Sequence, residues 1–237
     1  QLSARFLFIK VLLAVYLIFK FSFFIFQGIV VIDYLKFNIL IPVISVILIL
    51  YSAVRIFRSH NFRSIISYYC LLYLSFILIC LALNSDNSIL ALYYFVIHYV
   101  LTGLFLVLIA WFVFCNTGNY NISNLAIIGN SSLLNRYNIL FLTLLLCFLP
   151  FSFLFLAYLY LLMSITNIFS GFLIILAIFA STLSISHLSL RLLNYSYFSN
   201  KEIKKLNNLH DNIYYLISVI IIYLIMIFKI PFLSWVK

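Results

Sequence analysis

Residues 5–18 read RFLFIKVLLAVYLI, an apolar run that carries one cation, Lys10, inside it. A charge at that depth of a membrane span costs roughly 2.5–3.5 kcal/mol on insertion scales. Two interpretations follow. Lys10 lies only a few residues into the run, so its long stem can reach the interface by snorkelling. Otherwise it needs a partner, a water-filled cavity or a function in ion transfer.

The composition is that of an integral membrane protein. Of the 237 residues, 67% are apolar and 8% are charged, whereas soluble domains carry about 25% charged residues. The formal net charge is +10. Because the cations flank apolar segments, as membrane topology requires, we do not predict a nucleic acid as a partner.

Apolar runs long enough to cross a membrane number about seven, at roughly 20 residues each. The sequence therefore predicts an all-α integral membrane protein with a single membrane domain over residues 1–237. Pro150 lies in the fifth run, where it removes a backbone donor and clashes with the preceding turn, so we expect this helix to break there. The break is either a packing kink or a discontinuous helix that exposes backbone to an ion path. The spans lie near residues 4–26, 37–57, 65–84, 89–115, 137–163, 168–195 and 212–235.

The loops between these spans alternate in charge. Arginines and lysines gather in every second loop, and the intervening turns hold few or none. By the positive-inside rule, the N-terminus and the cationic loops lie inside and the C-terminus outside. The cations that define this side are Arg55, Arg58, Arg63, Arg136, Arg191, Lys201, Lys204 and Lys205.

Two histidines lie inside predicted spans. His98 is either a neutral imidazole bonded to a neighbouring hydroxyl such as Thr102, or a proton relay. His187 has Ser184 and Ser186 beside it and is read as a packing histidine. Each is alone on its span, which argues against a cytochrome b. The cysteines form no CxxC pair, so we predict no iron–sulfur or zinc site.

Several stretches, taken in order along the chain, resemble the antiporter-like membrane subunits of respiratory complex I. Residues 61–68, NFRSIISY, are similar to the family's N-I-K-R-x-x-A-Y-S-S motif. Residues 149–155, LPFSFLF, resemble its broken helix I-P-P-x-x-G-F, and residues 227–233, IFKIPFL, resemble its closing helix. The segments at 95–102 and 181–198 look like the helices around that break. The best match is the C-terminal half of NADH dehydrogenase subunit 2.

The resemblance implies an antiporter-like half-channel and assigns roles to three residues. Lys10 falls on the family's mid-membrane lysine, and His98 would relay protons between Lys10 and the outer exit. Tyr158 stands where the family has a lysine or glutamate, so a phenol replaces one titratable residue of the family's proton path. The family's second proline and its glycine at the break are also missing. The chain itself would hold no redox cofactor and no metal, because NADH and quinone chemistry belong to other subunits.

The resemblance also implies the location and the partners. We expect the mitochondrial inner membrane, the other complex I subunits, and lipids such as cardiolipin. In the family, the N-terminal half carries a glutamate and a lysine on helices that this sequence lacks. We therefore expect a separate chain of about seven spans, docked against the segments 4–26 and 37–57, because a lysine facing lipid alone is costly.

Three other interpretations stay open. In the first, the chain is a subunit 4 paralogue, although Asn61 stands where that subunit usually has aspartate. In the second, it is a structural membrane-arm subunit that has lost pumping, and Tyr158 favours this interpretation. In the third, it belongs to a multisubunit cation/proton antiporter of the same fold. We expect the chain to be a subunit of an enzyme, a proton-translocating NADH:ubiquinone reductase.

Overall fold

The computed structural model describes residues 34–83, 85–126, 139–140, 143, 146, 152–165 and 168–197. Within these segments the regular elements are helices, apart from one isolated β-bridge between Asn61 and Asn121. The predicted all-α class is confirmed. Lys10, Pro150 and the predicted spans near 4–26 and 212–235 lie outside the described residues.

The long helices coincide with the predicted spans to within about three residues at each end, which is the usual uncertainty of boundaries predicted from a sequence. Four of them are long and apolar enough to cross a membrane, judged by length and composition in the part of the chain that is described. The helices are α2 (Tyr34–Arg58), α3 (Phe62–Leu83), α4 (Asp86–Thr117), α7 (Phe153–Met163) and α8 (Ile168–Tyr197), with a short 3-10 helix η1 (Ile122–Asn124).

Local signals set the ends of α4. Ser85 caps the N-terminus: its side chain accepts from the Ser88 N–H, and the Ser88 hydroxyl oxygen accepts from the Ser85 N–H in return. This reciprocal pair satisfies donors that a helix start leaves open. Gly118 ends the helix at φ +71°, a left-handed conformation that glycine adopts without strain.

The fifth predicted span is interrupted, as expected from Pro150. Residues 143 and 146 are helical, and a new helix, α7, begins at Phe153. Its N-cap Ser152 has extended backbone (φ −71°, ψ 151°), and its hydroxyl oxygen accepts from the Phe155 N–H at 3.1 Å. Since proline disfavours helical geometry before it, a restart shortly after Pro150 has a direct physical cause.

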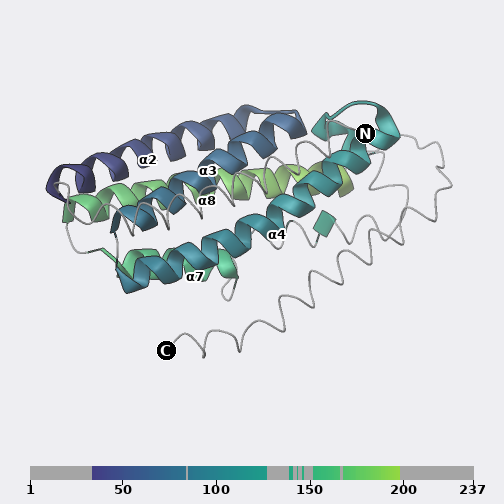
Figure 1. The fold of residues 1–237 in the computed structure, drawn as a ribbon. Helices are drawn as coiled ribbons and strands as arrows, with labels where there is room; N and C mark the ends of the chain where they lie inside the picture. The colour runs from purple at the N-terminus through teal and green to yellow at the C-terminus, as the bar shows by residue number, and fades with distance from the viewer. Residues whose placement is uncertain are drawn as a thin grey trace, which may run out of the picture.

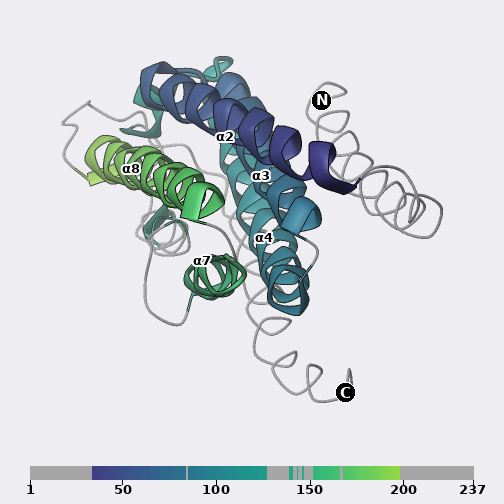
Figure 2. The ribbon, with the colours of Figure 1, turned by 90° about the vertical axis from the view of Figure 1, so that its left-hand side faces the viewer.

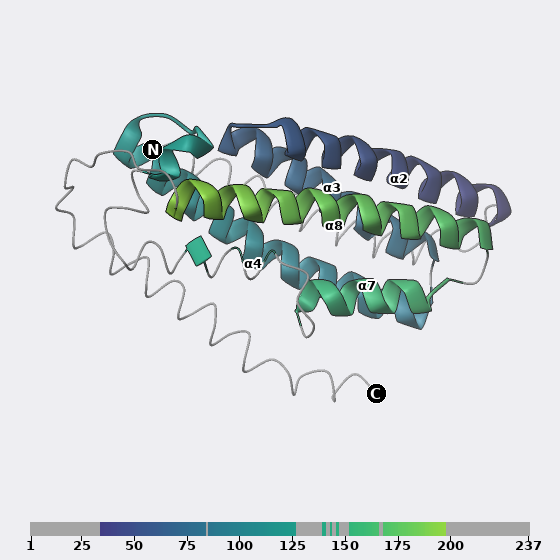
Figure 3. The ribbon, with the colours of Figure 1, turned by 180° about the vertical axis from the view of Figure 1, so that it is seen from behind.

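The helices form a bundle in the order α8–α2–α3–α4–α7, in which each helix packs on the next. Figure 1 shows their axes running side by side, and Figure 2 shows the arc that they form when viewed nearly end-on. α8 packs mainly against α2, although α7 precedes it in the chain; Figure 3 shows α8 alongside α2 from behind. The sequence order is therefore not the packing order.

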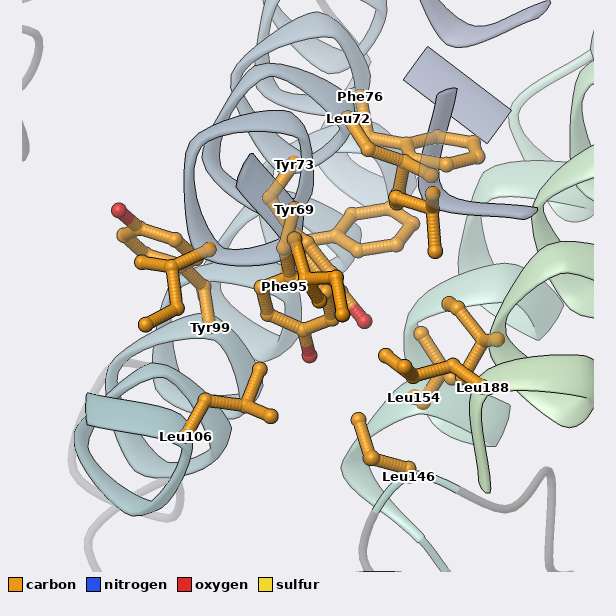
Figure 4. Packing of buried hydrophobic residues seen from close by; sticks show 14 of the residues in the cluster. Tyr69, Leu72, Tyr73, Phe76, Phe95, Tyr99, Leu106, Leu146, Leu154 and Leu188 are labelled. Atoms are coloured by element: carbon orange, nitrogen blue, oxygen red, sulfur yellow. The ribbon is translucent and has the colours of Figure 1, made fainter. Parts of the chain in front are cut away.

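Aromatic side chains fill the middle of the bundle. Figure 4 shows Tyr69, Tyr73 and Phe76 of α3 beside Phe95 and Tyr99 of α4. All five are buried, and the Phe76 and Phe95 rings stack with centroids 4.9 Å apart. This layer holds the candidate site described below.

One end of the bundle collects the cations, and we call it the arginine end: Arg55, Arg58, Arg63 and Arg191. Arg191 reaches from α8 to the C-terminal end of α2, where it donates to the Phe57 carbonyl at 3.2 Å, and to the α2–α3 loop, where it donates to His60 Nδ1 at 3.0 Å. Two main-chain bonds join that loop to the segment before η1: Phe62 N–H to the Tyr120 carbonyl and Ile122 N–H to the His60 carbonyl, both 2.9 Å. Within the described residues the only carboxylate, Asp86, begins α4 at the opposite end of that helix.

Candidate proton-transfer site

His98 lies on α4 and faces α3. It is 2% exposed, and its imidazole Nε2 has no hydrogen-bond partner among the described residues. The ring lies 5.6 Å, centroid to centroid, from the ring of Tyr73, whose buried hydroxyl also has no hydrogen-bond partner there. Leaving a buried polar group without a partner costs about 1–3 kcal/mol. His187 Nδ1 is the third buried atom of this kind among the described residues.

Thr102, the hydroxyl expected to bind the His98 ring, makes a different contact. Its Oγ1 donates to the backbone carbonyl of His98 at 2.6 Å. The same oxygen pairs with the hydroxyl of Tyr69. A threonine hydroxyl has one hydrogen, which is used on the carbonyl, so Tyr69 is the donor in this bond between α3 and α4. The structure thus shows Thr102 bound to the His98 carbonyl and to Tyr69, and it shows no bond from Thr102 to the imidazole ring.

Tyr158 lies on α7, is 1% exposed, and pairs with a serine of α8. Its hydroxyl lies 2.8 Å from Ser181 Oγ, and Ser181 in turn donates to the Ile178 carbonyl at 2.8 Å. The single Ser181 hydrogen is thus used on its own helix, and Tyr158 donates to Ser181. The Tyr158 phenol is a buried hydrogen-bond donor in this structure.

Aromatic rings connect the two polar centres. Phe95 lies one helical turn before His98 and contacts the Tyr73 ring at 6.3 Å and the Tyr158 ring at 5.4 Å. Phe76 also contacts Tyr158, at 5.4 Å. His98 contacts the Tyr73 ring and Tyr158 contacts the Phe95 ring, so the Tyr73–Phe95 contact connects the two residues within one aromatic core. Lys10 lies outside the described residues, and its place relative to them stays a prediction.

Sequence reasoning missed Tyr69 and Tyr73, the residues of α3 that face the site. They are four residues apart, a spacing that puts both on one side of a helix. Their rings lie 4.6 Å apart, and both are buried. That spacing was visible in the sequence, but tyrosines are so abundant in this chain, with 18 in all, that it did not stand out.

The remaining candidates fall at other places. His187 stacks on Phe57 at 3.8 Å and 23°, near the arginine end. Ser184 and Ser186 donate to the carbonyls of their own helix and not to its ring. Cys70 Sγ lies 2.9 Å from the Tyr99 hydroxyl. No group of three or more histidine, cysteine or acidic side chains that could hold a metal ion occurs in the described part of the chain.

Replacing Tyr158 by phenylalanine tests its contact with Ser181. The variant loses a buried hydrogen bond between α7 and α8, so we expect the free energy of unfolding to fall by about 1 kcal/mol. Proton translocation by the assembled complex should also slow. Thermal unfolding of the purified chain in detergent and a vesicle proton-uptake assay measure the two effects.

The matched control for this variant is Tyr160→Phe. Tyr160 lies two residues along the same helix, is half-buried, and stacks on Tyr94 at 5.6 Å. We expect this ring contact to survive loss of the hydroxyl. Equal effects of the two variants would mean that the Tyr158–Ser181 bond has no special role, and an unchanged proton flux in Tyr158→Phe would make Tyr158 a packing residue.

Comparisons with known proteins place the fold. No family model matches this sequence, and no curated protein matches it. The structure is similar to a chain of the membrane-bound sulfane sulfur reductase (MBS), described as an archaeal respiratory membrane complex, with a TM-score of 0.69 at 17% sequence identity. The match covers 82% of this chain and 40% of that chain. This protein therefore shares the fold of a chain of an archaeal respiratory membrane complex and spans less than half of its length.

Proposed function

We propose that this chain is a membrane-arm subunit of a respiratory complex and takes part in proton translocation through buried side chains. The observation that carries the proposal is His98, which is 2% exposed and has an Nε2 without a hydrogen-bond partner among the described residues. An imidazole can accept a proton at one nitrogen and release one from the other. The fold shared with a chain of a respiratory membrane complex supports the same conclusion.

Within this function we assign three roles. Lys10 is the titratable group that gains and loses a proton, His98 relays protons on the path beyond it, and Tyr158 supplies a hydrogen-bonding hydroxyl. Lys10 lies outside the described residues, so its role rests on the sequence resemblance. The chain acts without a redox centre of its own, and electron transfer belongs to partner subunits.

The finer proposal is a subunit of the mitochondrial NADH:ubiquinone oxidoreductase, most similar to its subunit 2. The ordered motifs at residues 61–68, 149–155 and 227–233 support it. The mitochondrial inner membrane, cardiolipin and a separate chain for the N-terminal half stay predictions. Subunit 4 and a multisubunit cation/proton antiporter remain the alternatives in the same fold.

A structural subunit that no longer pumps is the second candidate function. The observation that favours it is the Tyr158–Ser181 bond at 2.8 Å, in which the phenol is held by a serine whose own hydrogen is bound to the Ile178 carbonyl. Such a fixed pair stabilises packing between α7 and α8 without any proton exchange.

Purification of the intact particle tests the proposed function. The chain is tagged, extracted from its native membrane in a mild detergent, and isolated with its partners. We expect flavin and iron–sulfur clusters to co-purify in a constant ratio to the chain, together with NADH-dependent reduction of quinone. A particle that contains the chain but no redox centre would contradict the respiratory assignment and favour the antiporter. An unrelated tagged membrane protein from the same source controls for contamination.

A further inference from the structure

One face of α2 is exposed along much of its described length and changes from apolar to cationic at its C-terminal end. Ile44, Ile47 and Tyr51 are 47%, 59% and 46% exposed, and Arg55 and Arg58 follow on the same side, also exposed. The steps of three or four residues between them place all five side chains on one helix face. We call this face the α2 stripe. Its cationic end belongs to the arginine end of the bundle.

Arg55 is held in position by two tyrosines. Its Nε donates to the Tyr51 hydroxyl at 3.2 Å, and its guanidinium carbon lies 5.3 Å from the Tyr51 ring centroid and 6.0 Å from that of Tyr68 on α3. The two rings meet edge-on, 6.1 Å apart at 79°. A cation near a helix C-terminus is favourable by itself, but that effect does not require an aromatic clamp. The clamp uses Nε and leaves the two terminal nitrogens of Arg55 for another acceptor.

The charges of Arg55 and Arg58 lack a carboxylate partner in the described part of the chain. Asp86, the one described acid, lies at the start of α4, away from the arginine end. The other arginines there are engaged differently: Arg191 donates to Phe57 and His60, and Arg63 lies 4.0 Å above the Tyr120 ring. Among the described residues, the α2 stripe is therefore a surface whose positive charges have no carboxylate partner and lie directly beside exposed apolar side chains.

We propose that the α2 stripe binds an anionic phospholipid, whose phosphate lies against Arg55 and Arg58 and whose acyl chains lie along Ile44 and Ile47. This inference deepens the proposed function, which includes cardiolipin among the predicted partners, by assigning an anionic lipid to one face of this chain. The expected separate chain then docks against residues 4–26 and leaves this face of α2 to lipid. α2 is apolar enough over Ile41–Arg58 to cross a membrane, with a mean hydropathy of 1.9. A tyrosine and cations at the end of an apolar span are suited to the headgroup level of a bilayer. Guanidinium groups bind phosphate oxygens in a planar, paired geometry. A lipid matches both parts of the stripe, whereas free phosphate matches only the arginines.

The experiment measures how much lipid the chain retains. The full chain, purified in the complex in which it assembles, is delipidated in detergent and incubated with dioleoyl-phosphatidylglycerol or dioleoyl-phosphatidylcholine. These lipids share their acyl chains and differ in headgroup charge. Native mass spectrometry counts the bound lipids. We expect retention of phosphatidylglycerol over phosphatidylcholine, lowered about fivefold by Arg55→Gln and further by the Arg55→Gln/Arg58→Gln pair. Phosphatidylcholine retention should not change.

The matched control is Arg63→Gln, which removes a charge of the same end but outside the α2 stripe. It should leave phosphatidylglycerol retention near that of the unaltered chain. Arg55→Lys keeps the charge but loses the bond to Tyr51, so we expect an intermediate result, and it serves as the second variant where Arg55→Gln does not fold. Ile47→Asn should weaken binding of the lipid without a change in charge.

Three outcomes would overturn the proposal. Equal retention of the two lipids by the unaltered chain would show that headgroup charge is not recognised. If Arg63→Gln lowers phosphatidylglycerol retention as much as Arg55→Gln does, the lipid is attracted by the charge of the whole arginine end and there is no specific site on the α2 stripe. Displacement of phosphatidylglycerol by millimolar inorganic phosphate, with Ile47→Asn unchanged, would show a free-phosphate site in place of a lipid site.

Discussion

Replacement of His98 by leucine should slow proton translocation by the complex at least tenfold, which corresponds to a rise of about 1.4 kcal/mol or more in the activation barrier, while assembly survives. The side chain is buried, and its Nε2 has no hydrogen-bond partner among the described residues. The substitution removes the unpartnered Nε2 and places an apolar side chain of similar size beside the Tyr73 ring. What is lost is the group that can take up and release a proton. Proton uptake by vesicles that contain the purified complex measures the effect.

Two further histidine variants make this result specific. His98→Gln keeps a polar side chain but cannot titrate, so we expect it to fail as His98→Leu does. His187→Leu changes the other described histidine that lies inside a span; it stacks on Phe57 near the arginine end, outside the aromatic core. We expect it to translocate protons normally. Undiminished translocation by His98→Leu would exclude His98 from the proton path and remove the observation that carries the proposed function.

Lys10→Ala should abolish most proton translocation and the electron transfer coupled to it, again with assembly intact. A lysine within an apolar span is costly to keep, and removal of a group retained for proton exchange stops that exchange. Lys10→Arg should not restore the activity, because a guanidinium does not give up its proton in proteins. The measurements are proton uptake by reconstituted vesicles and quinone reduction by the same preparation.

Lys20→Ala is the control for Lys10. Lys20 lies near the far end of the same predicted span, where a lysine acts as a snorkelling anchor at the interface. We expect it to lower membrane insertion slightly and to leave pumping unchanged. If Lys10→Ala pumps normally, Lys10 is an anchor of the same kind, and the proton path must begin at another residue.

The helices were predictable because a membrane span needs a minimum apolar length, and that length is written in the sequence. The predicted segment 65–84 became Phe62–Leu83, and the predicted segment 168–195 became Ile168–Tyr197. The break of the fifth span was predictable for a different reason, since Pro150 cannot continue a helix without losing a hydrogen bond. These signals are local, so neighbours in space do not alter them.

The contacts of the site were not predictable, because they depend on how each helix is rotated about its axis and which helix it meets. Hydropathy places His98 inside a span but does not say that Tyr73 faces it from α3. It suggests Thr102 as a partner for the imidazole, whereas the hydroxyl binds the backbone carbonyl one turn away. The packing of α8 against α2 is likewise a long-range contact without a local signal.

The bonds between the α2–α3 loop and the segment before η1 have a consequence for motion. At the arginine end, the main-chain bonds Phe62–Tyr120 and Ile122–His60 tie the start of α3 to the region just after α4. At the other end, only two residues separate Leu83 of α3 from Asp86 of α4. α3 and α4 are thus joined at both ends, by these hydrogen bonds at the arginine end and by the short connection at the other. They cannot separate at the arginine end without breaking backbone hydrogen bonds. Among the described residues, we then expect rearrangement around His98 to come from side-chain rotation between α3 and α4 or from displacement of α7. The amides of Phe62 and Ile122 should exchange with solvent as slowly as the helices that they join.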